Sequence, residues 1–215
     1  MQNRQLILFD LDGTLTNPSL GITNSVMYAL EKYGIKTGDR KELYKFIGPP
    51  LLDSFRDFYG FSPEKSREAM KLYREYFSEK GIFENQVYEG IPEILSRLRG
   101  EGLSLAVATS KPEEYAKRIL EHFGLDKYFT VCAGADMEEK RSTKASVIER
   151  ALSLTGVSPQ KAVMIGDREH DIIGAKAFDM ASIGVLYGFG SKEELTRAGA
   201  DYIAASPQNL CEILL

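Results

Sequence analysis

The hydrophobic positions of this chain follow two different rhythms. Over most of its length, short apolar runs alternate with stretches whose apolar residues recur at helical spacing. The apolar runs lie at residues 6–10, 103–110, 129–136, 162–167 and 182–188, and helical stretches lie at 91–100, 113–123, 144–155 and 170–179. Strands that alternate with helices are typical of a parallel sheet covered by helices on both faces. We therefore expect an α/β fold with a Rossmann-like, doubly wound parallel sheet.

Between the first apolar run and the next, the pattern is helical throughout. Apolar residues at helical spacing predict three helices, over about 22–33, 51–59 and 63–80. Because the first strand must still pair with the later strands, this segment is expected to be an insertion and not an independent first domain. The pattern predicts a core domain of residues 1–16 and 87–215 and a helical cap domain of residues 17–86.

Composition excludes several classes of protein. The chain has 215 residues and a formal net charge of −4, which argues against binding to a nucleic acid polymer. Its two cysteines, Cys132 and Cys211, are far apart, so we expect reduced thiols in a cytoplasmic protein. Asp10 and Asp12 interrupt the apolar run near the N-terminus, and no run approaches the length of a membrane span, so neither a secretory signal nor a membrane segment is expected. The pattern leaves open whether the protein is a monomer or a homodimer.

Polar residues with candidate chemistry follow three of the predicted strands. They are Asp10 and Asp12 after the first strand, Thr109, Ser110 and Lys111 at the end of 103–110, and Asp167 and Asp171 at and after the end of 162–167. Each has a plainer alternative, as an acid that ends a strand at a turn or as a helix cap. Ligands of open parallel sheets, however, bind beyond the carboxyl ends of the strands, where these residues would meet.

The expected meeting of four carboxylates predicts a cation between them. Carboxylates in a cleft with little water repel one another, and a divalent cation removes that cost. Oxygen ligands together with a phosphate group suit Mg²⁺. Thr109, Ser110 and the N-terminus of the helix after Pro112 would form a cradle for a phosphate.

Two further residues are candidates for contact with the ligand. Lys144 begins a predicted helix; a lysine is usually a solvated surface charge, but a site this acidic needs a second cation. Gly48 in the stretch IGPPL would let the backbone approach a ligand, or the stretch is a simple break between two helices. His122 is expected on a helix surface, and the pattern assigns no role to Arg168, Glu169 or His170.

Four stretches together resemble the haloacid dehalogenase-like superfamily. They are DLDGTLT at 10–16, VATSK at 107–111, a lysine ahead of the penultimate clear strand, and GDREHD at 166–171, and they occur in the right order across the whole chain. Within the superfamily, the chain is similar to the phosphoglycolate phosphatase-type branch, which has a helical cap after the first strand. FIGPPL at 46–51 and GDREHD are also similar to a bacterial 5′-nucleotidase-like group.

The resemblance implies a role for each candidate. Asp10 would be the nucleophile that forms an aspartyl-phosphate, and Asp12 would be the general acid and base. The Asp10 carboxylate, the Asp12 backbone carbonyl and Asp167 would hold Mg²⁺, and Asp171 would support them, directly or through water. Thr109 would hydrogen-bond a phosphoryl oxygen, and Lys144 would balance the negative charge.

The chain departs from the family pattern at two places. Many relatives have a proline after the motif lysine, whereas Ala145 follows Lys144 here, with Lys140 and Arg141 close by. Ser110 stands where many relatives have asparagine, which puts the role of that side chain in doubt.

The sequence therefore predicts a Mg²⁺-dependent phosphatase acting on a small soluble phosphate monoester, of the phosphoglycolate or nucleoside monophosphate class. Pyrophosphate is a further possible substrate. The alternatives are a phosphomutase similar to β-phosphoglucomutase and a non-catalytic phospho-acceptor module.

Overall fold

A six-stranded parallel sheet forms the centre of the molecule, in a computed structural model that describes residues 4–138 and 142–215. Its strands, in spatial order, are β5 (Val131–Ala135), β4 (Ser104–Pro112), β1 (Leu6–Phe9), β6 (Ala162–Gly166), β7 (Ala181–Val185) and β8 (Tyr202–Ala204). The predicted α/β class is confirmed.

The register of the central strand determines which residues meet at the sheet edge. Phe9, the last residue of β1, lies beside Val107 of β4 and Ile165 of β6. Asp10, Thr109 and Asp167 follow within two residues of these positions. Because all three strands run in one direction, their polar endings come out at the same edge.

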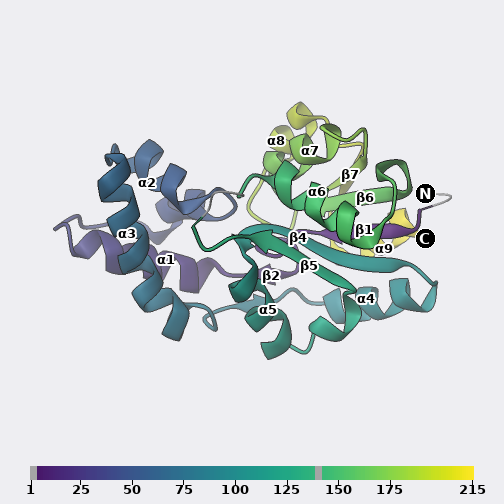
Figure 1. Cartoon of the computed structure of the whole chain (residues 1–215), viewed down its shortest axis with the longest axis horizontal. Helices are drawn as coiled ribbons and strands as arrows, with labels where there is room; N and C mark the ends of the chain where they lie inside the picture. Colours follow the sequence, from purple (N-terminus) through teal and green to yellow (C-terminus); the bar gives the residue numbers. More distant parts are fainter. Residues whose placement is uncertain (1–3, 139–141) are drawn as a thin grey trace.

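Helices cover both faces of the sheet (Figure 1). One face carries α6 (Lys144–Thr155), α7 (Glu169–Lys176) and α8 (Lys192–Ala198), and the other carries α4 (Ile91–Gly100), α5 (Glu113–His122) and α9 (Pro207–Leu214). Leu6 and Leu8 pack against α6, whereas Ile7 and Phe9 belong to the core on the α4 and α5 side. Strand β1 is buried on both faces, which explains why its apolar residues do not alternate with polar ones.

A helical segment lies to one side of the sheet, at the left of Figure 1. It contains α1 (Ser19–Glu31), the 3₁₀ helix η1 (Arg40–Phe46), α2 (Leu51–Tyr59), α3 (Pro63–Tyr76) and the π-helical turn η2 (Phe77–Gly81). The chain enters and leaves this segment through two short antiparallel strands, β2 (Thr16–Asn17) and β3 (Gln86–Val87). We call residues 18–85 the helical segment.

Local sequence signals set the ends of these helices. Gly60 ends α2 with a φ of +63°, and the hydroxyl of Ser62 accepts a hydrogen bond from the Lys65 amide at the start of α3. The β2–β3 pair and the 3₁₀ helices η1, η3 (Asp126–Tyr128) and η4 (Pro159–Lys161) were not predicted, because such short elements carry too few residues to show a period.

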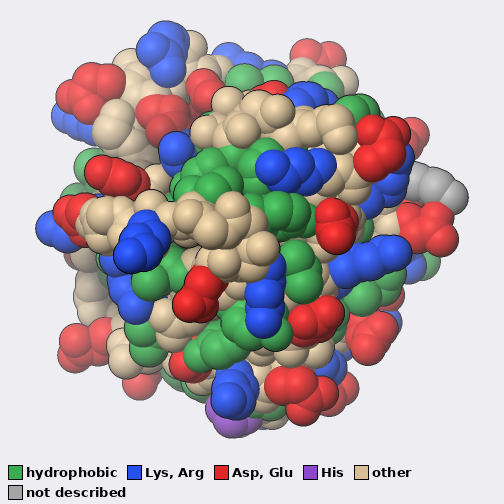
Figure 2. Space-filling model, turned by 90° about the vertical axis from the view of Figure 1, so that its left-hand side faces the viewer, with side chains coloured by type: hydrophobic (Ala, Val, Ile, Leu, Met, Phe, Trp, Pro, Cys, Tyr) green, Lys and Arg blue, Asp and Glu red, His purple; other side chains and the backbone are tan. Residues whose placement is uncertain are grey.

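The surface carries mixed charge. In Figure 2, which views the end formed by the helical segment, basic and acidic side chains are interspersed and neither sign dominates. Within the two described ranges, no helix has the length and apolar character needed to cross a membrane.

Candidate active site

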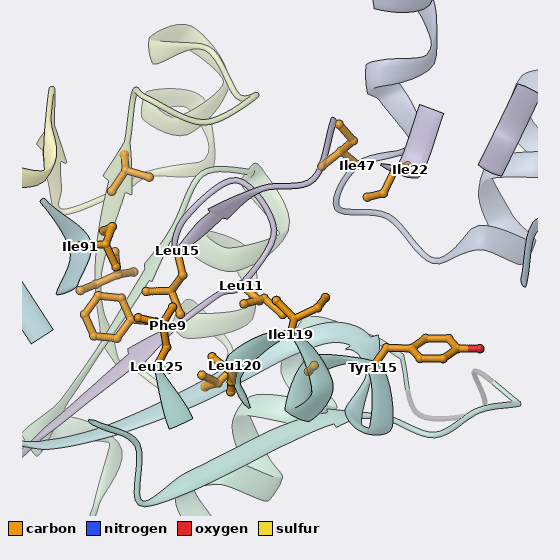
Figure 3. Close-up of a cluster of buried hydrophobic side chains, with 14 of the residues drawn as sticks. Phe9, Leu11, Leu15, Ile22, Ile47, Ile91, Tyr115, Ile119, Leu120 and Leu125 are labelled. Atoms are coloured by element: carbon orange, nitrogen blue, oxygen red, sulfur yellow. The ribbon is translucent and has the colours of Figure 1, made fainter. Parts of the chain in front are cut away.

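A tight turn after β1 presents the first two carboxylates. The amides of Leu15 and Thr16 both donate to the carbonyl of Leu11, and Gly13 adopts a φ of +86°. Leu11 is buried in the core beside Ile119 (Figure 3). Asp10 and Asp12 are each less than a tenth exposed, at 3% and 7%. Alternation along the extended chain thus directs the leucine into the core and leaves two acids on the other side.

Three buried carboxylates form a cluster at this edge. One oxygen from each of Asp10, Asp167 and Asp171 lies within 4.8 Å of the others. Asp167 Oδ2 accepts a hydrogen bond from the Phe189 amide at 2.8 Å, while its Oδ1 is buried and has no hydrogen-bond partner among the described residues. Asp171 Oδ2 accepts from the Arg168 amide at 3.1 Å. The cluster therefore has oxygen atoms available for a cation.

Glycines make this close approach possible. A Cβ atom at Gly13 would lie 2.2 Å from Asp167 Oδ2, and one at Gly166 would lie 2.0 Å from Asp171 Cγ. Any side chain at these positions would displace a carboxylate, so the glycines of the two motifs are needed for the spacing of the acids.

Burial makes ionisation of these acids costly. It raises the pKa of Asp167 well above its usual value, and the nearby Asp171 and Asp10 raise it further. Burial also raises the pKa of Asp171 to about 6, against the opposing effect of Lys144. An all-oxygen set of buried carboxylates that repel one another fits a hard divalent cation such as Mg²⁺.

Lys144 lies inside the acidic cluster. Its Nζ is 2.8 Å from Asp10 Oδ1 and 2.8 Å from Asp171 Oδ1, and it donates to the Ala108 carbonyl at 3.1 Å. Burial alone would lower the pKa of this amine, but the two carboxylates outweigh burial and raise it. The competing candidates, Lys140 and Arg141, lie outside the described residues.

The end of β4 contributes Thr109, Ser110 and Lys111. Thr109 is buried, and its Oγ1 accepts from the Lys111 amide at 3.3 Å. The Nζ atom of Lys111 forms an ion pair with Asp12 Oδ2 at 2.5 Å. Burial raises the pKa of Asp12, and this lysine opposes the rise. The sequence analysis included Lys111 in the VATSK stretch but gave it no role. Its position directly after Ser110 was the signal that could have identified it as a site residue.

A cavity of about 50 Å³ lies between the sheet edge and the helical segment. The core contributes Asp12, Ser110 and Lys111 to its lining, and the helical segment contributes Gly48 and Arg74 among others. The remaining wall is mostly apolar, with residues such as Ile22, Phe46, Tyr73, Phe77 and Tyr115. Sequence analysis did not single out Arg74, because a basic residue on a helix of the helical segment has no signal before that helix is placed beside the sheet edge.

The other candidate residues named from the sequence do not all line this cavity. Gly48 and Ser110 also line a second hollow, together with Lys144 and His170. Burial lowers the pKa of the His170 imidazole, and the neighbouring Arg168 lowers it further. His122 packs against Phe83 instead, with ring centroids 4.5 Å apart, and lines a different hollow. The carboxylate of Asp12 is not a member of the three-acid cluster, and its predicted metal contact was through the backbone carbonyl.

Comparison with known proteins now gives the class. The family described as haloacid dehalogenase-like hydrolase matches residues 7–185. The chain belongs to this family, and the prediction of a hydrolytic enzyme is confirmed.

Individual relatives cover nearly the whole chain. It is 45% identical to a 5′-nucleotidase of Pseudomonas aeruginosa over 97% of this chain and 94% of that protein. It is 37% identical to the tyrosine-protein kinase PtkA of Mycobacterium tuberculosis over 99% of this chain and 73% of the kinase. The crystal structure of a predicted phosphatase from Clostridium acetobutylicum is similar with a TM-score of 0.97, at 49% identity and 98% coverage of both chains.

Proposed function

We propose that this protein is a Mg²⁺-dependent phosphatase that hydrolyses a small soluble phosphate monoester through an aspartyl-phosphate. The observation that carries the proposal is the position of Asp10. Its carboxylate follows the central strand and shares a buried cluster with Asp167, Asp171 and Lys144. A carboxylate that attacks phosphorus needs positive charge beside it, here Lys144 and the proposed metal, because both the carboxylate and the phosphate are negatively charged.

In the first step, Asp10 attacks phosphorus and the bond to the leaving oxygen breaks. Asp12 gives its proton to that oxygen, so the leaving group departs as a neutral alcohol function. In the second step, Asp12 takes a proton from a water molecule, whose oxygen attacks phosphorus and releases inorganic phosphate and Asp10.

The remaining residues would hold the metal, orient the phosphate and balance its negative charge. Asp10, Asp167, Asp171 and the Asp12 carbonyl would hold Mg²⁺. When bound, the metal supplies positive charge that stabilises the phosphoryl oxygens in the transition state. Thr109 and Ser110 would donate to those oxygens, and Lys144, which pairs with Asp10, would balance the negative charge of that carboxylate and of the phosphate.

Residues 17–86 would act as a cap domain over a core of residues 1–16 and 87–215, with β2 and β3 as the hinge. The cavity between sheet edge and helical segment supports this division, since residues from both sides line it. Closure of the cap would exclude bulk water and so strengthen the electrostatic interactions in the site.

The cavity also favours a type of leaving group. Its wall contains two basic side chains, Arg74 and Lys111, and Lys111 is paired with the Asp12 carboxylate. A leaving group with a negative charge, such as the carboxylate of phosphoglycolate or the second phosphate of pyrophosphate, would be attracted to these basic side chains, whereas a nucleoside carries no such charge.

The proposal is tested by release of inorganic phosphate from p-nitrophenyl phosphate in the presence of Mg²⁺. Asp10→Asn should lower kcat by at least about a thousandfold, because the amide is not a nucleophile. Near-normal activity of this variant would show that Asp10 is not the nucleophile. A panel of phosphoglycolate, pyrophosphate and nucleoside monophosphates then ranks substrates by kcat/KM.

The same assay separates the alternatives. A phosphomutase would isomerise sugar 1- and 6-phosphates and release little phosphate, and a phospho-acceptor module would hold a stable aspartyl-phosphate. Asp12 beside the nucleophile favours hydrolysis over the phospho-acceptor module, because it provides the base that activates water.

A further inference from the structure

Arg168 connects the acidic cluster to the helical segment. It is the residue directly after Asp167, and its backbone amide donates to Asp171 Oδ2 at 3.1 Å. Its side chain is 18% exposed and leads away from the cluster toward the helical segment. The proposed chemistry gives this guanidinium no role.

Two hydrogen bonds fix the guanidinium in place. Its Nε donates to Glu194 Oε1 of α8 at 2.8 Å, and the same oxygen accepts from the Glu169 amide at 2.9 Å. Its Nη1 donates to the carbonyl of Ile47 in the helical segment, also at 2.8 Å. The Arg168 guanidinium thus hydrogen-bonds to the core through Nε and to the helical segment through Nη1.

The contact on the helical segment is made at the loop that covers the site. Residues 47–50, which we call the site loop, join η1 to α2, and Gly48 and Pro50 line both hollows beside the catalytic residues. Gly48 has a φ of +108°, and a Cβ atom there would lie 3.2 Å from Arg168 Cγ. The site loop therefore rests directly on the Arg168 side chain.

The hydrogen bond from Arg168 gives a partner to a buried carbonyl of the helical segment. Ile47 is fully buried, so its carbonyl would be left without a partner if the guanidinium were removed while the loop stayed in place. Tyr44 of η1 packs against Phe189 of the core at the same corner, with ring centroids 5.5 Å apart. Phe189 in turn donates its amide to Asp167, so both contacts start next to the acidic cluster.

We propose that Arg168 is a positioning residue that latches the site loop over the phosphoryl site. Through it, the β6–α7 loop that carries Asp167 also determines how closely Gly48 and Pro50 approach the substrate. The latch is a feature of the fold, so its test does not require the proposed phosphatase activity.

The test is hydrogen–deuterium exchange of the full chain, followed in the peptide that spans residues 44–55. Arg168→Met should speed exchange in this peptide by about tenfold, since a charge-assisted hydrogen bond is lost. Glu194→Ala should act in the same direction, because it releases the anchor of the guanidinium. Phosphate release by Arg168→Met should fall in kcat/KM by about tenfold.

Arg118→Met is the matched control. Arg118 also crosses from the core to the helical segment, where it donates to the Ser78 carbonyl at 3.0 Å, away from the site loop. This variant should leave exchange of the 44–55 peptide unchanged. The latch is refuted if neither Arg168→Met nor Glu194→Ala speeds exchange there, or if Arg118→Met speeds it equally.

Discussion

At the scale of single residues, the site is a balance of buried charges. Lys144 places one ammonium group between Asp10 and Asp171, and Lys111 places another on Asp12. Buried charges are costly unless they are paired, so each lysine offsets the burial of the carboxylate beside it. The two cations act on different acids: one on the proposed nucleophile and one on the proposed acid and base.

Lys144→Met should therefore reduce kcat/KM for phosphate release by at least about a hundredfold, because Asp10 loses its cation in a buried site. Lys117→Met is the control: Lys117 pairs with Glu113 on the surface, where the lysine side chain is 54% exposed, and activity should not change. Near-normal activity of Lys144→Met would remove this lysine from the site.

At the scale of elements, the turn between β1 and β2 spaces the acids. Gly13 has a positive φ and lies against the Asp167 carboxylate, so the turn after β1 packs closely on the β6–α7 loop. The turn has no room for a side chain, and the distance between the two loops depends on it.

Gly13→Ala should weaken Mg²⁺ binding by at least about tenfold in a calorimetric titration, because the new methyl group displaces Asp167. Gly34→Ala provides the comparison. Gly34 also has a positive φ, of +68°, but no described atom outside its two neighbouring residues lies within 4 Å of a Cβ built there. The Gly34→Ala variant should lose only about 1 kcal/mol of stability and should keep its Mg²⁺ affinity. Equal Mg²⁺ affinities in the two variants would contradict the packing argument.

At the scale of the whole molecule, the acidic cluster makes stability depend on pH. Burial holds the pKa of Asp171 at about 6 and that of Asp167 well above its usual value, against an ordinary value of 3.8. Between the ordinary and the raised values, the folded protein binds more protons than the unfolded chain. The contribution of these groups to stability therefore falls as pH rises through this window. A bound divalent cation favours the ionised forms and offsets that loss.

Saturating Mg²⁺ should raise the Tm by roughly 5–10 °C at about pH 7.5, from mass action and the usual dependence of Tm on free energy. At about pH 5.5 the rise should be smaller, because protons compete with the metal for Asp167 and Asp171. Differential scanning calorimetry at both pH values measures it. An equal rise at the two pH values, or a full rise in Asp167→Asn, would rule out this cluster as the metal site.

The sequence by itself determined the fold class and the edge of the sheet at which chemistry would occur. Both follow from local rules: alternating strands and helices require a covered parallel sheet, and parallel strands bring their carboxyl ends to one edge. The placement of Asp10, Asp167 and Asp171 together is a consequence of those rules.

Only the tertiary structure showed the partners of Lys111 and Arg168. Lys111 reaches Asp12 across 99 positions of sequence, and Arg168 reaches the Ile47 carbonyl across 121. Contacts at such separations leave no periodic signal in the chain, because they depend on the order of the strands and on where the helical segment is placed. Hydrophobic periodicity shows which face of a single helix or strand is buried. The pairing of two charges depends instead on which two elements lie next to each other.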